Sequence, residues 1–244
     1  MIRRLLKLLL LDAIIAILPF STSAVENSDS PICTSLEACL AILSTPATNY
    51  DKGISKSVQA AATKLQSFGR PAVKPLLQLL QSTDESVRDQ AGYALSETKE
   101  LLPEDLPTLQ KALFFGNGWV SGAIGQIGTP EAFRALVDDL RQNPQTHTQT
   151  TGALADGGRK AIPLLLEAIS CEPGCPSREL SAAIAFVFGQ MNTNAVAAVE
   201  PLVDIAQDES KADELRLATL SMLKAIGPYA KAYREPLRLL TAFL

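Results

Sequence analysis

One large apolar position recurs along this chain at an almost constant interval. Successive anchors are separated by 30, 29, 30, 32 and 37 residues, and small residues precede each of them. The anchors are Leu65, Leu95, Ile124, Leu154, Phe186 and Leu223. A turn position follows four residues after each anchor, and it is usually glycine. A repeat of this length, built from two helices, predicts a solenoid in which each unit stacks on the next.

The segment from Gly69 to Glu100 gives the clearest unit. Its first half carries apolar residues at i, i+3, i+4 and i+7, which predicts an amphipathic helix. A polar turn ending in the capping residue Asp84 follows, and the second half repeats the helical pattern up to Leu95. Neither helix is able to bury its apolar stripe alone. The pair must therefore pack against neighbouring pairs.

The same plan predicts an all-α fold, a right-handed, armadillo-like α-solenoid of about five to six helix pairs. Residues 25–55 are expected to form an N-terminal segment with an irregular cap, and residues 56–244 the repeat domain. A last helix is expected over Tyr229–Leu244. The predicted helices are 36–44 with 57–68, 103–115 with 118–127, 130–141 with 146–155, 160–170 with 177–190, and 195–207 with 212–226.

The first 24 residues have the order of a secretory signal peptide. Three positive charges precede an apolar stretch that ends at Pro19, and small residues up to Ala24 offer a cleavage site. The apolar stretch is shorter than the roughly 20 residues that span a bilayer, and Asp12 interrupts it. We therefore expect export to the periplasm or outside the cell, with Val25 as the mature start. The alternative is an uncleaved membrane anchor.

The charge balance bears on the kind of partner. The full chain has a net charge of −4, and residues 1–24 contribute +2, so the remaining chain carries −4 − 2 = −6. Phosphate neutralisation by basic residues supplies most of the affinity of nucleic-acid-binding proteins. A mildly acidic chain without a basic stripe is therefore a poor candidate for nucleic-acid binding.

Four cysteines follow the predicted cleavage site, and an even number agrees with an oxidising compartment. Three pairings are possible, and the local one, Cys33–Cys39 with Cys171–Cys175, fits the repeat layout best. Two other readings are a zinc site and a redox pair. The spacings match neither a structural zinc knuckle nor a Cys-x-x-Cys motif, so we expect structural disulfides.

Residues 69–80 and 84–95 resemble a HEAT repeat of the short bacterial kind. Residues 161–166 and 200–203 are similar to the first helix of this repeat, and residues 214–220 are similar to its second helix. The resemblance covers residues 56–244 and implies fold more than function, because HEAT arrays serve many partners. It also implies that Arg88 and Arg216 join acidic residues in a ladder between repeats. The glycines at 122, 125 and 152 are unusual inside helices, and we expect them to let neighbouring helices approach closely.

The anchor register predicts which side of each second helix is open to a partner. At 100° per residue, the positions −5, −2 and +2 relative to the anchor point away from it. From the second repeat to the fourth they include the expected binding strip on the concave face: Gln90, Tyr93, Glu97, Trp119, Gln126, Gln149 and Asp156. The later repeats offer Ser181, Ile184 and Phe188, then Ala218, Ser221 and Ala225. The alternative is that the strip is an ordinary solvated face with Trp119 packed against Phe114 and Phe115.

The sequence carries no motif of an enzyme, and we expect no catalytic residue, metal or cofactor. The single histidine, His147, has no ligand partner in sequence. The predicted function is a non-catalytic scaffold that binds a protein or peptide, with no stable membrane span after signal cleavage. Short bacterial HEAT-like repeats are also similar to the phycobilin lyase family, which implies an alternative role in attaching a tetrapyrrole to a partner protein. That role would be expected in the cytoplasm with reduced cysteines.

Overall fold

A computed structural model describes residues 33–48, 53–144, 148–170, 176–227 and 229. Over these residues the chain is all-α and contains no strand. The α-helices are α1 (Leu36–Leu43), α2 (Lys56–Gln66), α3 (Arg70–Leu79), α4 (Glu85–Glu97), α5 (Leu106–Phe114), α6 (Val120–Ile127), α7 (Pro130–Gln142), α8 (Thr148–Gly157), α9 (Ile162–Ile169), α10 (Arg178–Gln190), α11 (Val199–Gln207) and α12 (Asp213–Ile226). Short 3-10 helices lie at Pro103–Asp105, Gly158–Lys160 and Asn192–Ala198.

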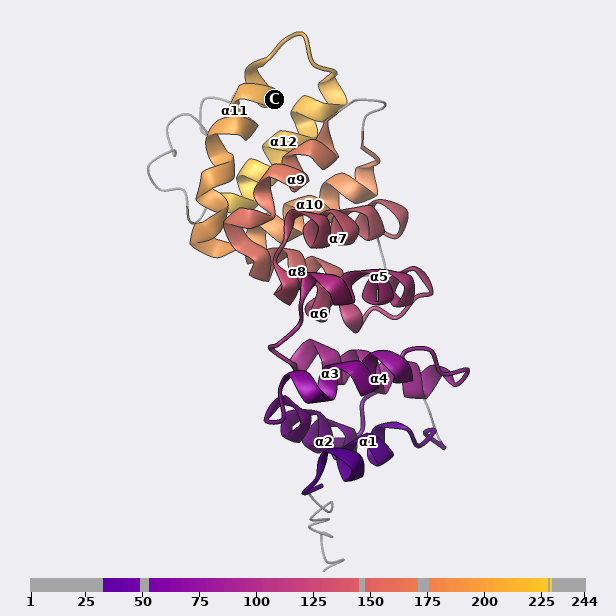
Figure 1. The fold of residues 1–244 in the computed structure, drawn as a ribbon. Coiled ribbons are helices and arrows are strands. Elements are labelled where there is room, and N and C mark those ends of the chain that lie inside the picture. Colours follow the sequence, from indigo (N-terminus) through magenta and orange to yellow (C-terminus); the bar gives the residue numbers. More distant parts are fainter. Residues whose placement is uncertain (1–32, 49–52, 145–147, 171–175, 228, 230–244) are drawn as a thin grey trace, which may run out of the picture. The chain divides into compact units, whose positions relative to one another are not determined.

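The helices form pairs, and the pairs stack in chain order. In Figure 1, α3 lies beside α4, α5 beside α6 and α7 beside α8. The second helices form a continuous layer, because α2 packs against α4, α4 against α6, α6 against α8, α8 against α10 and α10 against α12. This succession is an α-solenoid, as the repeat predicted.

The predicted helices agree with the observed ones to within a few residues, and capping side chains set several of the starts. The carboxylate of Asp84 accepts from the backbone N–H of Val87 at 3.1 Å and begins α4. Thr129 and Ser177 cap α7 and α10 in the same way. Each cap satisfies an N–H group that has no partner within its helix.

The anchors form the spine of the core, with one correction. Leu65, Leu95, Ile124 and Leu154 are fully buried. Phe186, in contrast, is 52% exposed, and its neighbour Val187 is completely buried. The anchor of the fifth repeat is therefore Val187, and the prediction of Phe186 was wrong by one residue.

Two of the three helix glycines allow close helix packing, as expected. A Cβ at Gly122 would lie 3.0 Å from the Cβ of Ser96, and one at Gly125 would lie 3.2 Å from the Cβ of Ala153. These contacts bring α6 against α4 on one side and α8 on the other. The expectation fails at Gly152, where a Cβ would meet nothing within 4 Å.

Arg88 and Arg216 form a different contact from the predicted acidic ladder between repeats. Arg88 Nη1 donates to the carbonyls of Ser82 and Thr83 at 3.0 Å each, just after α3 ends. Arg216 Nε donates to the carbonyl of Ala206 in the last turn of α11 at 3.1 Å, and its Nη1 pairs with Asp213 on its own helix. Carbonyl groups at a helix C-terminus lack helical partners and attract cations. Each arginine thus ties the two helices of one repeat together.

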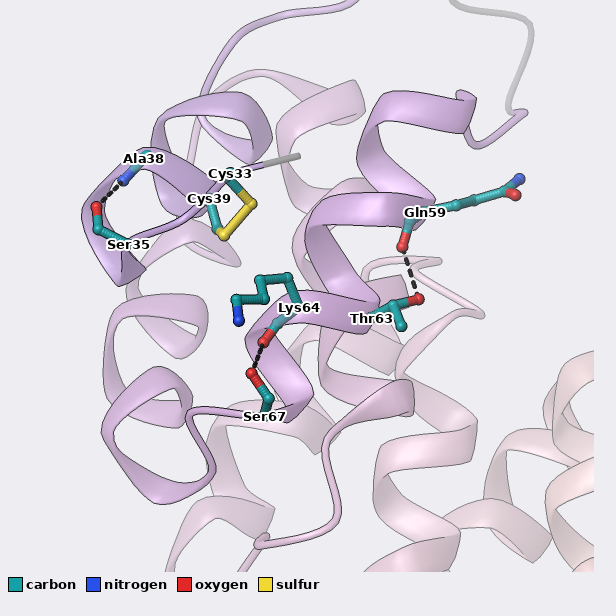
Figure 2. The surroundings of a disulfide bond; sticks show 8 residues. All are labelled: Cys33, Ser35, Ala38, Cys39, Gln59, Thr63, Lys64 and Ser67. Atoms are coloured by element: carbon teal, nitrogen blue, oxygen red, sulfur yellow. Dashed lines mark hydrogen bonds between the residues drawn. A yellow bond between two sulfur atoms is a disulfide. The ribbon is translucent and has the colours of Figure 1, made fainter. Parts of the chain in front are cut away.

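The Cys33–Cys39 disulfide is present and closes a short loop at the start of α1. Figure 2 shows it beside α2, the helix that carries Gln59 and Thr63. Cys39 is completely buried and Cys33 nearly so, so the bridge is part of the N-terminal core. The predicted pairing of Cys171 with Cys175 lies outside the described residues. So do the signal peptide, His147 and almost all of the predicted C-terminal helix.

Candidate functional site

The candidate site is the second-helix face, by which we mean the positions −5, −2 and +2 around the buried anchors of α2, α4, α6, α8, α10 and α12. With Val187 as the fifth anchor, all of these positions are exposed or half-buried except one, Gln90. The register therefore predicted the open side of the second helices correctly in most repeats.

Gln90 is the only one of these positions that is buried, at 5% exposed, so its assignment to the binding strip was wrong. The loop after α1 covers it: Gln90 Nε2 donates to the carbonyl of Thr45 at 3.4 Å, and the N–H of Ala47 donates to Ser86 Oγ at 2.9 Å. The loop therefore packs on the N-terminal half of α4. Gln90 holds that loop and is not available to a partner.

An aromatic pair lies at the centre of the second-helix face. The rings of Tyr93 on α4 and Trp119 at the start of α6 are 5.5 Å apart and nearly perpendicular, at 87°. Both side chains are half-buried. The alternative placed Trp119 against Phe114 and Phe115, but the ring contact of Trp119 is with Tyr93, and the two phenylalanines pair with each other at 5.6 Å. Edge-to-face packing fixes the Trp119 ring while part of it stays open to a partner.

The phenol of Tyr93 lies in a partly covered corner beside a carboxylate. Burial raises the pKa of Tyr93 above its ordinary value, and the nearby charge of Glu97, one turn later on α4, raises it further. Both effects disfavour the phenolate. The hydroxyl therefore stays protonated at neutral pH and remains a hydrogen-bond donor.

Amide and acidic side chains surround the aromatic pair. Gln126 is exposed, and its Nε2 donates to the backbone carbonyl of Ser96 on α4. Gln149 is exposed on α8, and its Oε1 would lie 3.5 Å from a Cβ at Gly118, which places it next to the start of α6. Asp156 is exposed at the far end of α8. The strip thus reduces to Tyr93, Glu97, Trp119, Gln126, Gln149 and Asp156, from three adjacent helices.

The next two second helices carry no comparable group. Ser181, Ile184 and Phe188, which were expected to be exposed, are buried, because the true anchor is Val187. The exposed or half-buried positions are instead Ala182, Ala185 and Gly189 on α10 and Ala218, Ser221 and Ala225 on α12. The aromatic, amide and acidic side chains of the face are therefore confined to α4, α6 and α8.

The charge on the second-helix face has one sign. Glu97 and Asp156 are the acidic residues at these positions, and none of the positions holds lysine or arginine. Among the described residues no group of three or more His, Cys, Asp or Glu side chains is placed to hold a metal ion. No helix in the described part of the chain is long and apolar enough to cross a membrane.

No curated protein matches the sequence significantly. Among solved structures, the complex of CpcE and CpcF of phycocyanin lyase from Nostoc sp. PCC7120 is 20% identical, covers 84% of this chain and 82% of that chain, and has a TM-score of 0.38. The designed armadillo repeat protein YIII(Dq)4CqI is 16% identical over 79% of this chain and 100% of that chain, with a TM-score of 0.32. A second designed armadillo repeat protein, in complex with the peptide (KR)4, is 15% identical with the same coverage and a TM-score of 0.33.

One segment of the chain matches a protein family in sequence. Residues 55–114 match the family described as HEAT repeats, and this segment runs from α2 to the end of α5. The same plan of paired helices continues from α6 to α12. Similarity to the HEAT-repeat family is therefore shown for residues 55–114, and the described helices after them follow the same paired plan.

Proposed function

We propose that this protein is a non-catalytic scaffold that binds a segment of another protein across α4, α6 and α8. The observation that carries the proposal is the Tyr93–Trp119 pair, held edge to face and half-buried on a strip whose other side chains are polar. Tryptophan and tyrosine in such surroundings are the residue types that dominate binding energy at protein interfaces. The neighbouring amides of Gln126 and Gln149 offer hydrogen bonds to the backbone of an extended segment.

The charge of the face supports a positively charged partner segment. Glu97 and Asp156 form no ion pair within the described part of the chain, and no basic residue shares the face with them. Complementary charge increases the rate of association and disfavours acidic partners. The open ring of Trp119 is also a favourable surface for a lysine or arginine side chain.

We propose further that the protein works in an oxidising compartment, the periplasm or the extracellular space. The signal-peptide pattern of residues 1–24 and the Cys33–Cys39 disulfide support this location. The phycobilin-lyase-like alternative expects reduced cysteines. A native N-terminus at Val25, with no free thiol on thiol counting, is the expected result. An N-terminus at Met1 with four free thiols would contradict the proposed compartment.

Site-specific crosslinking in the native cell tests the scaffold role. A photo-crosslinking amino acid replaces Gln149, and in a matched variant it replaces Ser221 on α12, which is equally exposed but lies outside the strip. We expect one reproducible protein adduct from position 149 that is lost when Trp119→Ala is added. The same adduct from both positions, or its persistence in the Trp119→Ala background, would count against the strip as the binding site.

A further inference from the structure

A cavity of about 660 Å³ opens between the second and third helix pairs, away from the strip. It is lined by the end of α3, the start of α4 and one side of α5. The side chains that bear on its chemistry are Gln81, Arg88, Thr108, Lys111, Phe115 and Asn117. Its volume falls within the range of roughly 300–1,000 Å³ that is usual for sites of small molecules.

The cavity exists because α3 and α5 are held together at one end only. The neighbouring first helices α5 and α7, and α7 and α9, pack closely, whereas α3 and α5 do not. Near the start of α3, Arg70 pairs with Asp105 and with Glu104 at 2.7 Å, and its backbone N–H donates to Glu100 at 2.7 Å. These contacts fix the N-terminal ends of both helices. The space remains toward their C-terminal ends, around Leu80 and Lys111.

A buried amide fixes the inner part of the cavity. Asn117 is 5% exposed, and its Nδ2 donates to the backbone carbonyl of Arg88 at 2.7 Å. A Cβ at Gly92 would lie 2.7 Å from Asn117 Oδ1, so the glycine makes room for this amide on α4. The loop between α5 and α6 is therefore held against α4. The inner wall of the cavity is therefore preformed and does not require a ligand to hold it in place.

The lining carries two positive charges and no acidic side chain. Arg88 is held in place by the two carbonyls that its Nη1 contacts, and the guanidinium has further N–H donors on its other nitrogens. Asp84, one turn earlier on α4, offsets part of this charge. Lys111 on α5 is exposed. Its positive charge is offset less than that of Arg88. An excess of positive charge in a cavity of a net acidic chain favours an anion.

The cavity also has an apolar wall. Phe115, which follows α5, is 68% exposed, and Leu80, Pro107 and Ala112 lie along the same cavity. The ring of Phe115 is packed edge to face against Phe114. A flat apolar group in the cavity would cover Phe115 and remove its apolar surface from water.

We propose that this cavity binds an organic anion in which a carboxylate or sulfonate is attached to a flat apolar ring system. Lys111 and Arg88 contact the anionic group, and Phe115 packs on the ring. Thr108 and Gln81 supply hydrogen bonds at the entrance. The site is separate from the strip and does not depend on the proposed scaffold role.

The probe for this site is 1-anilinonaphthalene-8-sulfonate, whose fluorescence rises in an apolar environment. Its uncharged analogue, N-phenyl-1-naphthylamine, has the same rings without the sulfonate. We expect saturable binding of the sulfonate to the intact protein at a single site, and weaker binding of the analogue. Lys111→Gln and Phe115→Ala should each weaken sulfonate binding about 10-fold.

Matched variants separate this site from general surface binding. Lys99→Gln removes an exposed lysine that does not line the cavity, and Phe186→Ala removes a phenylalanine on α10 that is 52% exposed and does not line it either. Both controls should bind the sulfonate like the parent protein, and unfolding curves confirm that all four variants are folded. Equal losses in Phe186→Ala and Phe115→Ala, equal binding of the two probes, or no saturable binding would each overturn the proposal.

Discussion

Two parts of the second-helix face, one on α4, α6 and α8 and the other on α10 and α12, share the same helical repeat but differ in their outward side chains. On α4, α6 and α8 the outward positions hold an aromatic pair, amides and two carboxylates. On α10 and α12 they hold alanine, glycine and serine. The anchors of both halves, from Leu95 to Leu223, are equally buried. The repeat therefore fixes the inward positions and leaves the outward ones free to differ.

This difference suggests where recognition lies. Small side chains on α10 and α12 offer little area and few hydrogen bonds, although a partner would be able to approach their backbone closely. Large and polar side chains on α4, α6 and α8 offer both area and directional contacts. If one half of the face selects the partner, it is the half around Trp119.

The largest expected effect is that of Trp119→Ala on partner binding. Loss of the indole should weaken binding of a basic peptide about 30-fold, because a central aromatic anchor contributes at this level in protein interfaces. Isothermal titration calorimetry measures the dissociation constant. The matched change on the other half, Ser221→Ala, should leave it unchanged. Equal losses of peptide affinity in the two variants would show that the two parts of the face do not differ in binding.

A smaller effect is expected from the two acidic residues. The double variant Glu97→Gln with Asp156→Asn should weaken the same peptide about fivefold at low salt, and less at high salt, because exposed ion pairs are individually weak and are screened. Calorimetry at two salt concentrations measures this. A loss that does not depend on salt would mean that these residues act through structure and not through charge.

Two glycine-to-alanine substitutions test which positions of the second helices face outward and which pack against a neighbouring helix. Gly152→Ala should raise the free energy of unfolding by about 0.5–1 kcal/mol, because alanine favours a helix and its Cβ meets open space here. Gly125→Ala should gain less or lose stability, because its Cβ would press on Ala153. Urea unfolding measures both. A larger gain at residue 125 than at residue 152 would contradict the placement of these two positions.

The smallest expected effect concerns pH. The pKa of Tyr93 is raised in the folded protein, so the folded state holds the phenolic proton more tightly than the unfolded state does. The stability that this adds is complete below the ordinary tyrosine pKa of about 10 and is lost as the pH rises above that value. Urea unfolding should therefore show a steeper alkaline loss in the parent protein than in Tyr93→Phe. The same slope in both would show that Tyr93 is not in a covered corner.

Much of the fold was predictable because the repeat leaves a regular trace. Helix pairs follow from apolar spacing and from capping residues such as Asp84, which are local features of the chain. The register failed in α10, where Ile184 to Phe188 is almost continuously apolar and gives two adjacent choices of anchor. Packing of α10 against α12 decides between them, and it buries Val187 while Phe186 remains outside.

The site was less predictable, because it depends on contacts between distant segments. Gln90 occupies an outward position by register but is covered by a loop 45 residues earlier in the chain. The edge-to-face pairing of Tyr93 with Trp119 follows from the packing of α4 on α6, which spacing suggests but does not specify. The cavity beside Lys111 depends on the separation of α3 from α5, for which no local pattern exists.

The most direct test of the binding face uses the fluorescence of Trp119, which is the only tryptophan in the chain. The protein is titrated with a short peptide of alternating lysine and alanine, and in parallel with one of alternating glutamate and alanine. Binding across α4, α6 and α8 predicts a saturable change in emission with the lysine peptide and none with the glutamate peptide. A lysine peptide that binds by calorimetry without changing the emission, or equal responses to both peptides, would contradict the account.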